Sequence, residues 1–551
     1  MIITFDIESL DWNRIYAIGF YDGIATHILA DESKPNNYFI EWLLNELPDD
    51  SVVYAHNGGK FDFLFILKFM SDRGYKPYRF TLIHGSIVRF IIKYDHKKIE
   101  FRDSFTILPS SLRRLTYDFD VEHKKLEMDY NLGMKDANFR AYFSNDLIGL
   151  YEVLAKSDWL TEKLTVASNA MQQFRRLYPI KMSANSYAVN NIFRNAYAGG
   201  RVEIFKMLGS SLNYYDINSL YPSVMFDFKY PLPVRNNYEF TDSFSNKHQG
   251  IYKCDVSIDH IDIPLLYYHY NGKLVFPIGK FSGWYTDAEI RKAKEIGYKV
   301  DVKSGFKFFD SDFIFREYVN EFYEIKRHSS GSKKAIAKLM LNSLYGKFGQ
   351  RDTVMKYRIN VAEKYKDVEL YYKIGTFTIG SKKAKIHQDF MHSEIASMIT
   401  ANARLRLYSL FEKAKMQVYY CDTDSIITDA ELPVSDKLGD VKMEDKIQKY
   451  IAIAPKVYAY ITEHDNAPKS VLKAKGFRVD KLAFADYEAA LFKHDYAAFK
   501  TDFEHIASFR ESKVRHLEYS DKISVIKQLK SSYDKRIVLS DYTTVPLRIN
   551  E

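Results

Sequence analysis

Three aspartates in the second half of the chain have the type and spacing of a site for divalent cations. Asp422 and Asp424 are two residues apart in a short acidic turn, so on an extended chain both point to the same side. Asp216, which follows an apolar stretch far earlier, is the natural third acid. Carboxylates this close repel one another unless cations lie between them, and Mg²⁺ prefers carboxylate and phosphate oxygens. A bare Asp-Thr-Asp is also an ordinary turn, so the interpretation depends on the rest of the chain.

Four more acids in the first third could hold a second group of metal ions. Asp6 and Glu8 lie on one side of a predicted strand, and Asp62 lies in the first turn of a predicted helix, where an acid also favours the helix dipole. Asp146 is four residues after Tyr142 and shares its helical face. Carboxylates from separate elements, with a tyrosine that could orient a water, are what two-metal phosphodiester hydrolysis requires.

A third pattern suits a nucleoside triphosphate. On ideal helix geometry Lys334, Lys338, Asn342 and Tyr345 fall within an arc of roughly 80°, and apolar residues occupy the opposite side. Ammonium groups can bind phosphates, and a ring can stack on a base. A plain solvated lysine face would not include the amide and the ring.

These side chains need strands and helices that bring distant segments together. We expect strands over residues 2–10, 52–55, 212–216, 416–421 and 425–428, and helices over residues 61–70, 141–154 and 313–348, the last broken at 328–332. Residues 416–428 form a predicted hairpin with the acidic pair at its tip. The alternation of strands and helices allows an α/β and α+β multidomain protein.

The composition fits a protein of several domains that is located in a reducing compartment. The 551 residues include 46% hydrophobic and 16% aromatic residues, which indicates a globular protein. Lys and Arg number 79 against 71 acids, a net charge of +8 that fits a polyanionic partner without establishing one. Cys254 and Cys421 are too few for a disulfide framework. No secretion signal and no apolar run of about 20 residues is present, so we expect no membrane association and a location in the cytoplasm of a host cell or the compartment of a linear plasmid.

The acids of the first third lie in strings that resemble the proofreading 3′–5′ exonuclease of family B DNA polymerases. The three strings are Asp6-Ile-Glu8, Asn57-Gly-Gly-Lys-Phe61-Asp62 and Tyr142-Phe-Ser-Asn-Asp146. The resemblance implies a ribonuclease-H-like domain in which the four acids bind metals and the tyrosine positions a water. It also makes Asn57 and Phe61 ligands of single-stranded DNA.

The same resemblance implies further contacts to the single strand. Two strings, Ser104-Phe-Thr-Ile-Leu108 and Ser111-Leu112-Arg-Arg-Leu115, are similar to the family's single-strand element, and both remain candidates. Lys125 is similar to the family's lysine that supports the scissile phosphate.

The second half resembles the polymerase motifs of the same family. Asp216-x-x-Ser-Leu-Tyr221-Pro is a long family string, in which Tyr221 packs under the incoming sugar and excludes a 2′-hydroxyl. The resemblance implies that Asp216 and Asp424 bind two Mg²⁺, with Mn²⁺ as a substitute. Asp422 would assist, and the backbone carbonyl of Ile217 would add a ligand.

The remaining motifs imply contacts to nucleotide and DNA. Lys338-x-x-x-Asn342-Ser-Leu-Tyr345-Gly346 resembles the fingers motif, and Lys326 resembles its additional phosphate-binding lysine. The pair Lys456 and Tyr458 is similar to the motif that contacts the primer terminus. Tyr197-Ala-Gly199-Gly200, followed by Arg201, resembles the motif that binds template and coordinates synthesis with editing.

Two stretches between the polymerase motifs resemble the terminal-protein regions of the protein-primed branch of the family. The expected divisions are 1–165 for the exonuclease, 166–227 and 392–491 for the palm, 228–312 and 351–391 for terminal-protein regions 1 and 2, 313–350 for the fingers and 492–551 for the thumb. The first insertion would contact the priming protein. The second would close a ring around the DNA for processive, strand-displacing synthesis.

The sequence therefore predicts a proofreading DNA polymerase that replicates a linear genome from a protein primer. Its expected partners are primer-template DNA, dNTPs, a terminal protein and a single-stranded-DNA-binding protein, and we expect a monomer. The alternatives are a family B polymerase that uses a nucleic-acid primer and, from another class, an inactive DNA-binding scaffold.

Overall fold

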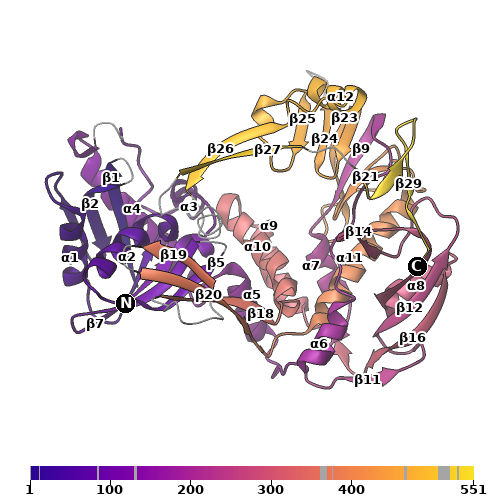
Figure 1. Ribbon diagram of the computed structural model, residues 1–551, viewed down its shortest axis with the longest axis horizontal. Coiled ribbons are helices and arrows are strands. Elements are labelled where there is room, and N and C mark those ends of the chain that lie inside the picture. The colour runs from indigo at the N-terminus through magenta and orange to yellow at the C-terminus, as the bar shows by residue number, and fades with distance from the viewer. Residues whose placement is uncertain are drawn as a thin grey trace.

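The computed structural model describes residues 2–10, 13–83, 86–129, 133–359, 369–374, 377–463, 468–506, 522–529 and 533–550. Parts of four expected regions lie outside the described residues: 1, 11–12, 84–85 and 130–132 of the exonuclease, 360–368 and 375–376 of the second insertion, 464–467 of the palm, and 507–521, 530–532 and 551 of the thumb. The chain forms α/β and α+β domains arranged side by side, with the N-terminal domain at one end (Figure 1).

The N-terminal domain is built on a seven-stranded mixed sheet of order β3-β2-β1-β4-β7-β6-β5. β1, β4 and β7 are parallel to one another, and the other neighbours are antiparallel. The strands are β1 Ile2–Leu10, β2 Arg14–Tyr21, β3 Thr26–Ala30, β4 Ser51–Ala55, β5 Tyr78–Ile83, β6 Ser86–Tyr94 and β7 Lys97–Asp103. The helices are α1 Asn36–Glu46, α2 Asp62–Asp72, α3 Leu112–Asp118 and α4 Phe139–Ala155.

The alternation along β1 decides which side chains reach the site. Ile3 and Phe5 are fully buried in the core that also contains residues of α1 and α2. The next residues point to the opposite face, where the Thr4 hydroxyl donates to the carbonyl of Leu147 on α4 at 2.7 Å. With a period of two, Asp6 and Glu8 therefore lie on the α4 face of the sheet.

A second seven-stranded sheet, of order β25-β24-β23-β9-β22-β21-β8, carries the acidic hairpin. The strands are β8 Val202–Ile204, β9 Leu208–Ile217, β21 Val418–Asp422, β22 Ser425–Thr428, β23 Val441–Ala454, β24 Val457–Thr462 and β25 Ser470–Ala474. One face packs with α11 Ser393–Lys413 and α7 Leu220–Asp227, and the other with α12 Phe484–Lys493. β9 is the strand that carries Asp216, and it lies between β22 and β23.

Two helices connect this sheet with the N-terminal domain. α9 Arg316–Arg327 and α10 Gly331–Phe348 pack on each other and on α5 Val166–Leu177. The first turn of α10 contacts α3 of the N-terminal domain. α6 Tyr187–Arg194 lies against α11.

The stretch between the two halves of the large sheet forms its own five-stranded sheet, of order β11-β16-β12-β15-β30. Its members are β11 Tyr238–Thr241, β12 Gly250–Ile258, β15 Ile278–Thr286, β16 Lys299–Phe308 and, from the C-terminal end of the chain, β30 Arg548–Asn550. α8 Asp287–Glu295 follows β15, and short pairs are formed by β10 Tyr230–Pro231 with β17 Ser311–Asp312 and by β13 Tyr268–Tyr270 with β14 Lys273–Val275. β30 pairs in parallel with β15, so the end of the predicted thumb region lies on the first insertion.

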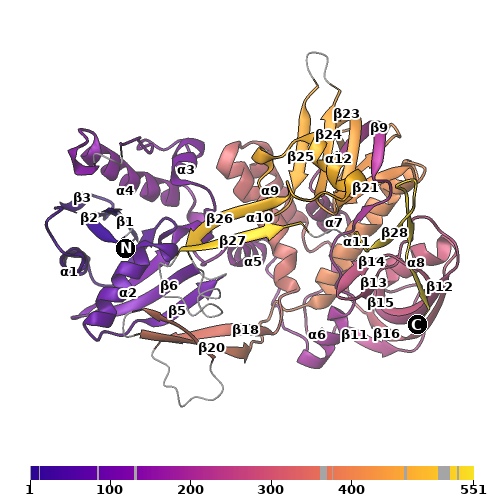
Figure 2. The same ribbon diagram turned by 45° about the horizontal axis from the view of Figure 1, so that its top comes forward.

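Two hairpin-like extensions complete the fold. β18 Thr353–Ile359, β20 Phe377–Lys385 and β19 Glu369–Ile374 form a three-stranded sheet against β5 and α2, with Phe377 and Ile379 inside the N-terminal core. The antiparallel pair β26 Lys500–Ile506 and β27 Lys522–Gln528 extends from the α12 side toward the N-terminal domain (Figure 2). β28 Arg536–Val538 and β29 Thr544–Pro546 form a last pair. Across the parts of the chain that the structure describes, no helix is long and apolar enough to cross a membrane.

Candidate active sites

Strand pairing brings Asp216 beside the tip of the acidic hairpin. Asp216 pairs directly with Ser425, the first residue of β22. The amide of Ile217 donates to the carbonyl of Asp424 at 2.7 Å. Thr423 has φ of +63°, which closes the turn between the two other aspartates. Asp216 therefore meets Asp422 and Asp424, which lie more than 200 positions later in the sequence, at one edge of the sheet.

The electrostatics of this edge fit a cation. Burial, and next the carboxylate of Asp424, raise the pKa of Asp216 to about 7. Burial and the charge of Asp422 also raise the pKa of Asp424. The ammonium of Lys338 lowers both pKa values but does not offset the repulsion. Divalent cations bound by Asp216 and Asp424 would keep both groups ionised, so the donor set fits Mg²⁺.

Among the described residues, the carboxylate of Asp422, unlike those of Asp216 and Asp424, is paired with a lysine. Both of its carboxylate oxygens accept from the ammonium of Lys456, Oδ2 at 2.6 Å. Lys456 sits in the turn between β23 and β24 with φ of +65°. The sequence predicted that Lys456 and Tyr458 both contact the primer. In the structure Tyr458 is only 5% exposed and packs on Tyr420, because its position in β24 points into the core beside α12.

The predicted nucleotide-binding residues face this edge from α7, α9 and α10. The rings of Tyr221 and Tyr345 stack with centroids 4.6 Å apart and planes at 17°. The ammonium of Lys326 donates to the hydroxyl of Ser219 at 2.6 Å. Lys338 is exposed and lies on the same face of α10 as Tyr345.

Two other predicted nucleotide-binding residues lie on the same helix. Asn342 is half-buried and Gly346 is exposed. A Cβ at Gly346 would meet no described atom within 4 Å, so the backbone is open to an approaching ligand.

The loop Tyr197–Arg201 touches the acidic turn. A Cβ at Gly200 would lie 2.6 Å from Cγ2 of Thr423, whereas one at Gly199 would meet none of the described atoms within 4 Å. The amide of Thr423 donates to the carbonyl of Arg201 at 2.7 Å. Tyr197 lies against Gly349 at the end of α10, and burial raises its pKa to about 12.

The acids of the N-terminal domain form a second cluster. Ligand oxygens of Asp6, Glu8 and Asp146 all lie within 4.8 Å of one another. Burial raises the pKa of Glu8 and of Asp62 to about 7, and burial followed by the charge of Asp62 raises that of Asp6. Among the described residues, one buried oxygen of Asp62 and one of Asp146 have no hydrogen-bond partner. Buried acceptors without donors, in a crowded acidic site, fit divalent cations.

Lys125 and Tyr142 lie at this cluster. The ammonium of Lys125 donates to Asp146 and, at 3.2 Å, to the hydroxyl of Tyr142. It also lies 4.6 Å from the centre of the Tyr142 ring. The sequence predicted a lysine on the scissile phosphate, and here that lysine pairs with one carboxylate of the cluster.

A cleft leads to the second cluster and separates the two candidate serines. Its lining consists of Phe5, Asp6, His56, Asn57, Phe105, Ser111, Leu112, Lys125, Asp146 and Leu150. Ser111 and Leu112, at the start of α3, are therefore open to a strand in the cleft. Ser104 is fully buried, and its hydroxyl donates to the carbonyl of Ala55 at 3.0 Å. Phe61 lies at the start of α2, edge-on to Phe65.

Asp103 is a site residue that the sequence reasoning missed. Its carboxylate accepts from the amides of Asn57 (2.9 Å), Gly59 (3.2 Å) and Phe105 (2.9 Å) and so shapes the loop before Asp62. Burial raises its pKa to about 6. The signal in the sequence was its position at the end of the strand Lys97–Asp103, directly before the candidate string that begins at Ser104.

Comparisons with known proteins find similarity to DNA polymerases. A family model described as DNA polymerase type B, organellar and viral, matches residues 45–140 and 135–428. A probable DNA polymerase of Podospora anserina is 27% identical over 98% of this chain and 57% of its own length. The DNA polymerase of Bacillus phage phi29 is 26% identical over 78% of this chain and 79% of its own. The chain spans about half the length of the fungal relatives it matches.

A solved structure extends the likeness to the fold. Phi29 DNA polymerase complexed with primer-template DNA and incoming nucleotide substrates has a TM-score of 0.76 at 20% identity. The match covers 96% of this chain and 99% of that one. This chain therefore has the multidomain fold of that polymerase.

Proposed function

This chain belongs to the type B DNA polymerases of organelles and viruses, and from that membership we propose that it is a DNA-directed DNA polymerase with a 3′–5′ exonuclease. The observation that carries the proposal is the meeting of Asp216 with the turn of Asp422 and Asp424 beside the lysine face of α10. A scaffold without activity would not need to keep these buried carboxylates together against their repulsion.

At the synthesis site each residue has a role that its surroundings support. Asp216 and Asp424 would hold divalent cations, which when bound supply the charge that activates the primer 3′-hydroxyl and steadies the triphosphate. Lys338 and Lys326 neutralise phosphate charge. Tyr221 and Tyr345 form the pocket for the base and the deoxyribose.

At the editing site Asp6, Glu8, Asp62 and Asp146 would hold the metal ions, with Mg²⁺ the expected species at both sites. The hydroxyl of Tyr142 would orient the attacking water. Lys125 would move from Asp146 toward the scissile phosphate. A frayed 3′ end would enter along Ser111 and Leu112.

We further propose that synthesis starts on a terminal protein and displaces the opposite strand of a linear genome, in the host-cell compartment that holds it. The five-stranded sheet of the first insertion exposes apolar rings that a protein partner could cover: Phe240 is 62% exposed, and Phe309, just after β16, is 52% exposed. A single-stranded-DNA-binding protein would cover the displaced strand.

Two assays test these proposals in turn. The protein with Mg²⁺ and dNTPs should extend a primed template and, without dNTPs, shorten a labelled single strand; a chelator should stop both reactions. If neither reaction occurs, the proposed activity is wrong and the alternative of an inactive DNA-binding scaffold is favoured. For priming, a labelled dNTP should become attached to the terminal protein on an unprimed linear template. Label that appears only on nucleic-acid primers would instead identify a polymerase without protein priming.

A further inference from the structure

A buried arginine donates hydrogen bonds to the backbone of the loop Tyr197–Arg201. Nη1 of Arg404, on α11, donates to the carbonyl oxygens of Ala198 at 2.6 Å and of Gly199 at 3.1 Å. A hydrogen bond from a charged donor is stronger than one between neutral groups. The two carbonyls belong to the residues just before Gly200, where an added Cβ would lie 2.6 Å from Thr423 of the acidic turn.

Arg404 is itself fixed by a residue of the first insertion. Its Nη2 and Nε donate to Oε1 of Glu289, on α8, at 2.7 and 3.2 Å. The guanidinium also lies 4.7 Å from the centre of the Tyr267 ring. Both partners are about 95% buried or more. An ion pair out of water needs good geometry on both sides, so it tolerates little movement of either element.

Glu289 divides its two oxygens between two tasks. Among the described residues, Oε1 accepts from Arg404 alone, whereas Oε2 accepts from the amide and hydroxyl of Thr286 at 3.1 and 3.0 Å and caps α8. The capping task and the loop-holding task can therefore be separated by substitution.

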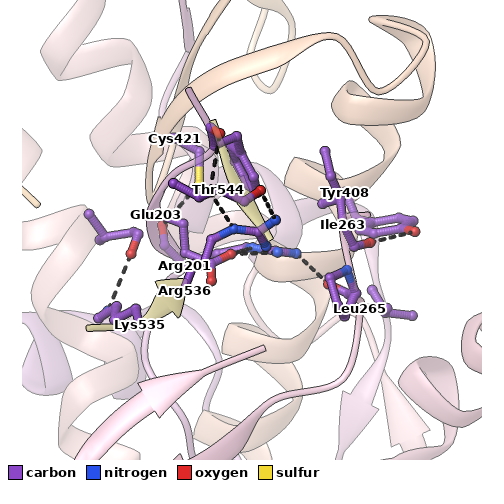
Figure 3. Close-up of polar contacts among 12 residues, drawn as sticks. Arg201, Glu203, Ile263, Leu265, Tyr408, Cys421, Lys535, Arg536 and Thr544 are labelled. Carbon is purple, nitrogen blue, oxygen red and sulfur yellow. Dashed lines mark hydrogen bonds and ion pairs between the residues drawn. The ribbon is translucent and has the colours of Figure 1, made fainter. Parts of the chain in front are cut away.

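A second buried arginine holds the other end of the same loop (Figure 3). Nη1 of Arg201 donates to the carbonyl of Pro264 at 2.6 Å, and Nε donates to Glu203 at 2.7 Å. The carbonyl of Arg201 accepts from the amide of Thr423. Both ends of the loop are thus tied to the first insertion, through Glu289 at one end and through Pro264 at the other.

We propose that Arg404 and Glu289 are positioning residues, whose ion pair seats the Tyr197–Arg201 loop against Thr423 and so places the loop for template binding at the catalytic turn. Because of the link through Glu289, the first insertion sets the position of the loop. The inference rests on the proposed function only for its effect on DNA, since the position of the loop can be measured without activity.

The variants are chosen because the two carboxylate oxygens of Glu289 have different partners. Glu289→Gln removes the charge that Arg404 needs, and Arg404→Lys keeps the charge but cannot form the same fork of hydrogen bonds. Thr286→Ala removes a capping partner without touching Arg404 and is the matched control for α8. Glu100→Gln, in the Arg89–Glu100 pair of the N-terminal domain, controls for loss of a partly buried ion pair elsewhere.

Amide hydrogen exchange is the first measurement, on peptides that contain residues 198–201 and 422–424. Glu289→Gln and Arg404→Lys should speed exchange in both peptides by about tenfold or more, because a charge-assisted hydrogen bond is lost. Thr286→Ala should speed exchange only in α8, and Glu100→Gln should leave both peptides unchanged. Unchanged exchange in Glu289→Gln and Arg404→Lys, or an equal change in Thr286→Ala, would overturn the proposal.

Primed-DNA binding and nucleotide addition are the second measurement. The two pair variants should weaken binding of primed template by about tenfold, because the loop is no longer seated. The fall in kcat for a saturating template should be smaller, because the pairing of β22 with β9 still holds Asp216 beside the acidic turn. Degradation of single-stranded DNA should stay at the wild-type rate. Equal template affinity in wild type and in both variants would contradict the proposal, whereas a wild-type protein that extends no primer would contradict the proposed function and leave the exchange result to decide the loop.

Discussion

A lysine is paired with one carboxylate at each of the two acidic sites. Lys125 binds Asp146 in the N-terminal domain, and Lys456 binds Asp422 in the large sheet. The other acids keep raised pKa values because burial and neighbouring carboxylates disfavour their charge. Each lysine offsets one negative charge of its cluster, and the carboxyls with raised pKa values must lose their protons to bind a cation, so we expect cation binding to release protons at both sites near neutral pH.

His56 provides a pH test in the cleft of the N-terminal domain. Its ring bonds the hydroxyl of Ser104 at 2.9 Å and the carbonyl of Ser110 at 2.7 Å, and burial lowers its pKa from 6.5 to about 4. The unfolded chain then binds the proton more tightly, so this contribution to stability is present above 6.5 and is lost as the pH falls toward 4.

The corresponding variant is His56→Gln, which has no titrating ring. We expect the difference in free energy of unfolding between wild type and variant to shrink as the pH falls through this window, measured by urea denaturation with a chelator present. Other titrating groups are shared by both proteins and cancel in the difference. A difference that does not change with pH would contradict the assignment.

The residue identities could be predicted from the sequence much better than their pairings. The acids lie in long strings at strand ends and helix faces, which local periodicity indicates. The pairs Lys456–Asp422 and Arg404–Glu289 join residues 34 and 115 positions apart, and no period in the sequence signals them. The burial of Tyr458 depends on which face of β24 meets α12, which only the assembled sheet decides.

Among the elements, the acidic hairpin depends on the neighbouring glycine loop. Gly200→Ala would place a Cβ 2.6 Å from Cγ2 and 2.8 Å from Oγ1 of Thr423, so the turn must move. Overpacking costs about 1–3 kcal/mol, so we expect primer extension to slow by about tenfold or more. Gly199→Ala, with open space around the new methyl, is the matched control for steric pressure on the turn.

A double variant separates steric pressure from lost backbone freedom. Thr423→Ala removes the two nearest atoms that the new methyl would meet and leaves Cβ at 3.1 Å, so Gly200→Ala with Thr423→Ala should recover most of the extension rate. The extension rate is measured under single-turnover conditions for wild type, for each of the two single variants and for the double variant. Failure of the double variant to recover would show that the turn and the loop are not coupled through this contact.

The N-terminus of α10 depends on an acid from another domain. Asp118, the last residue of α3, accepts from the amide of Ser332, and the hydroxyl of Ser332 donates to that of Ser110 at 3.0 Å. Asp118→Ala removes this cap and should destabilise the first turn of α10 by about 1 kcal/mol. Faster amide exchange at residues 331–334 measures the effect.

Two further variants make the cap prediction specific. Asp118→Asn keeps an acceptor oxygen and should retain most of the protection. Asp120→Ala removes a nearby exposed acid that pairs with Lys124 at 3.1 Å, and should leave α10 unchanged. Equal exchange in Asp118→Ala and wild type would contradict the role of this acid.

Across the whole molecule, the long-range strand pairings are what local sequence patterns could not supply. Strands such as β1 and helices such as α2 and α4 match the predicted ranges, because each is a single continuous segment with a clear period. β30 joins β15 across more than 260 residues, and the β18–β20 sheet joins the N-terminal core. The predicted domain boundaries stay predictions, since several regions share cores.

The β18–β20–β19 sheet offers a test of the proposed ring. The amide of Ile386 donates to the carbonyl of Asp352 at 2.6 Å, so the two ends of residues 353–385 lie together and a short turn can replace the segment. We expect this excision to abolish synthesis through duplex DNA while single-nucleotide addition to a recessed primer continues. The length of the product on a nicked circular template measures synthesis through duplex DNA. A quenched-flow assay measures single-nucleotide addition to the recessed primer. Strand displacement at the wild-type level would contradict the proposed role of the sheet.

The central claim is that Asp216 and Asp424 share divalent ions where nucleotides are joined, separately from the acids that edit. The most direct measurement is Mg²⁺-dependent extension and degradation by Asp424→Asn and Asp6→Asn beside wild type. Asp424→Asn should lose extension by about a thousandfold or more and still degrade single strands, because the loss of a metal-binding charge removes several kcal/mol of transition-state stabilisation. Asp6→Asn should do the reverse. Extension by Asp424→Asn at the wild-type rate would contradict the account.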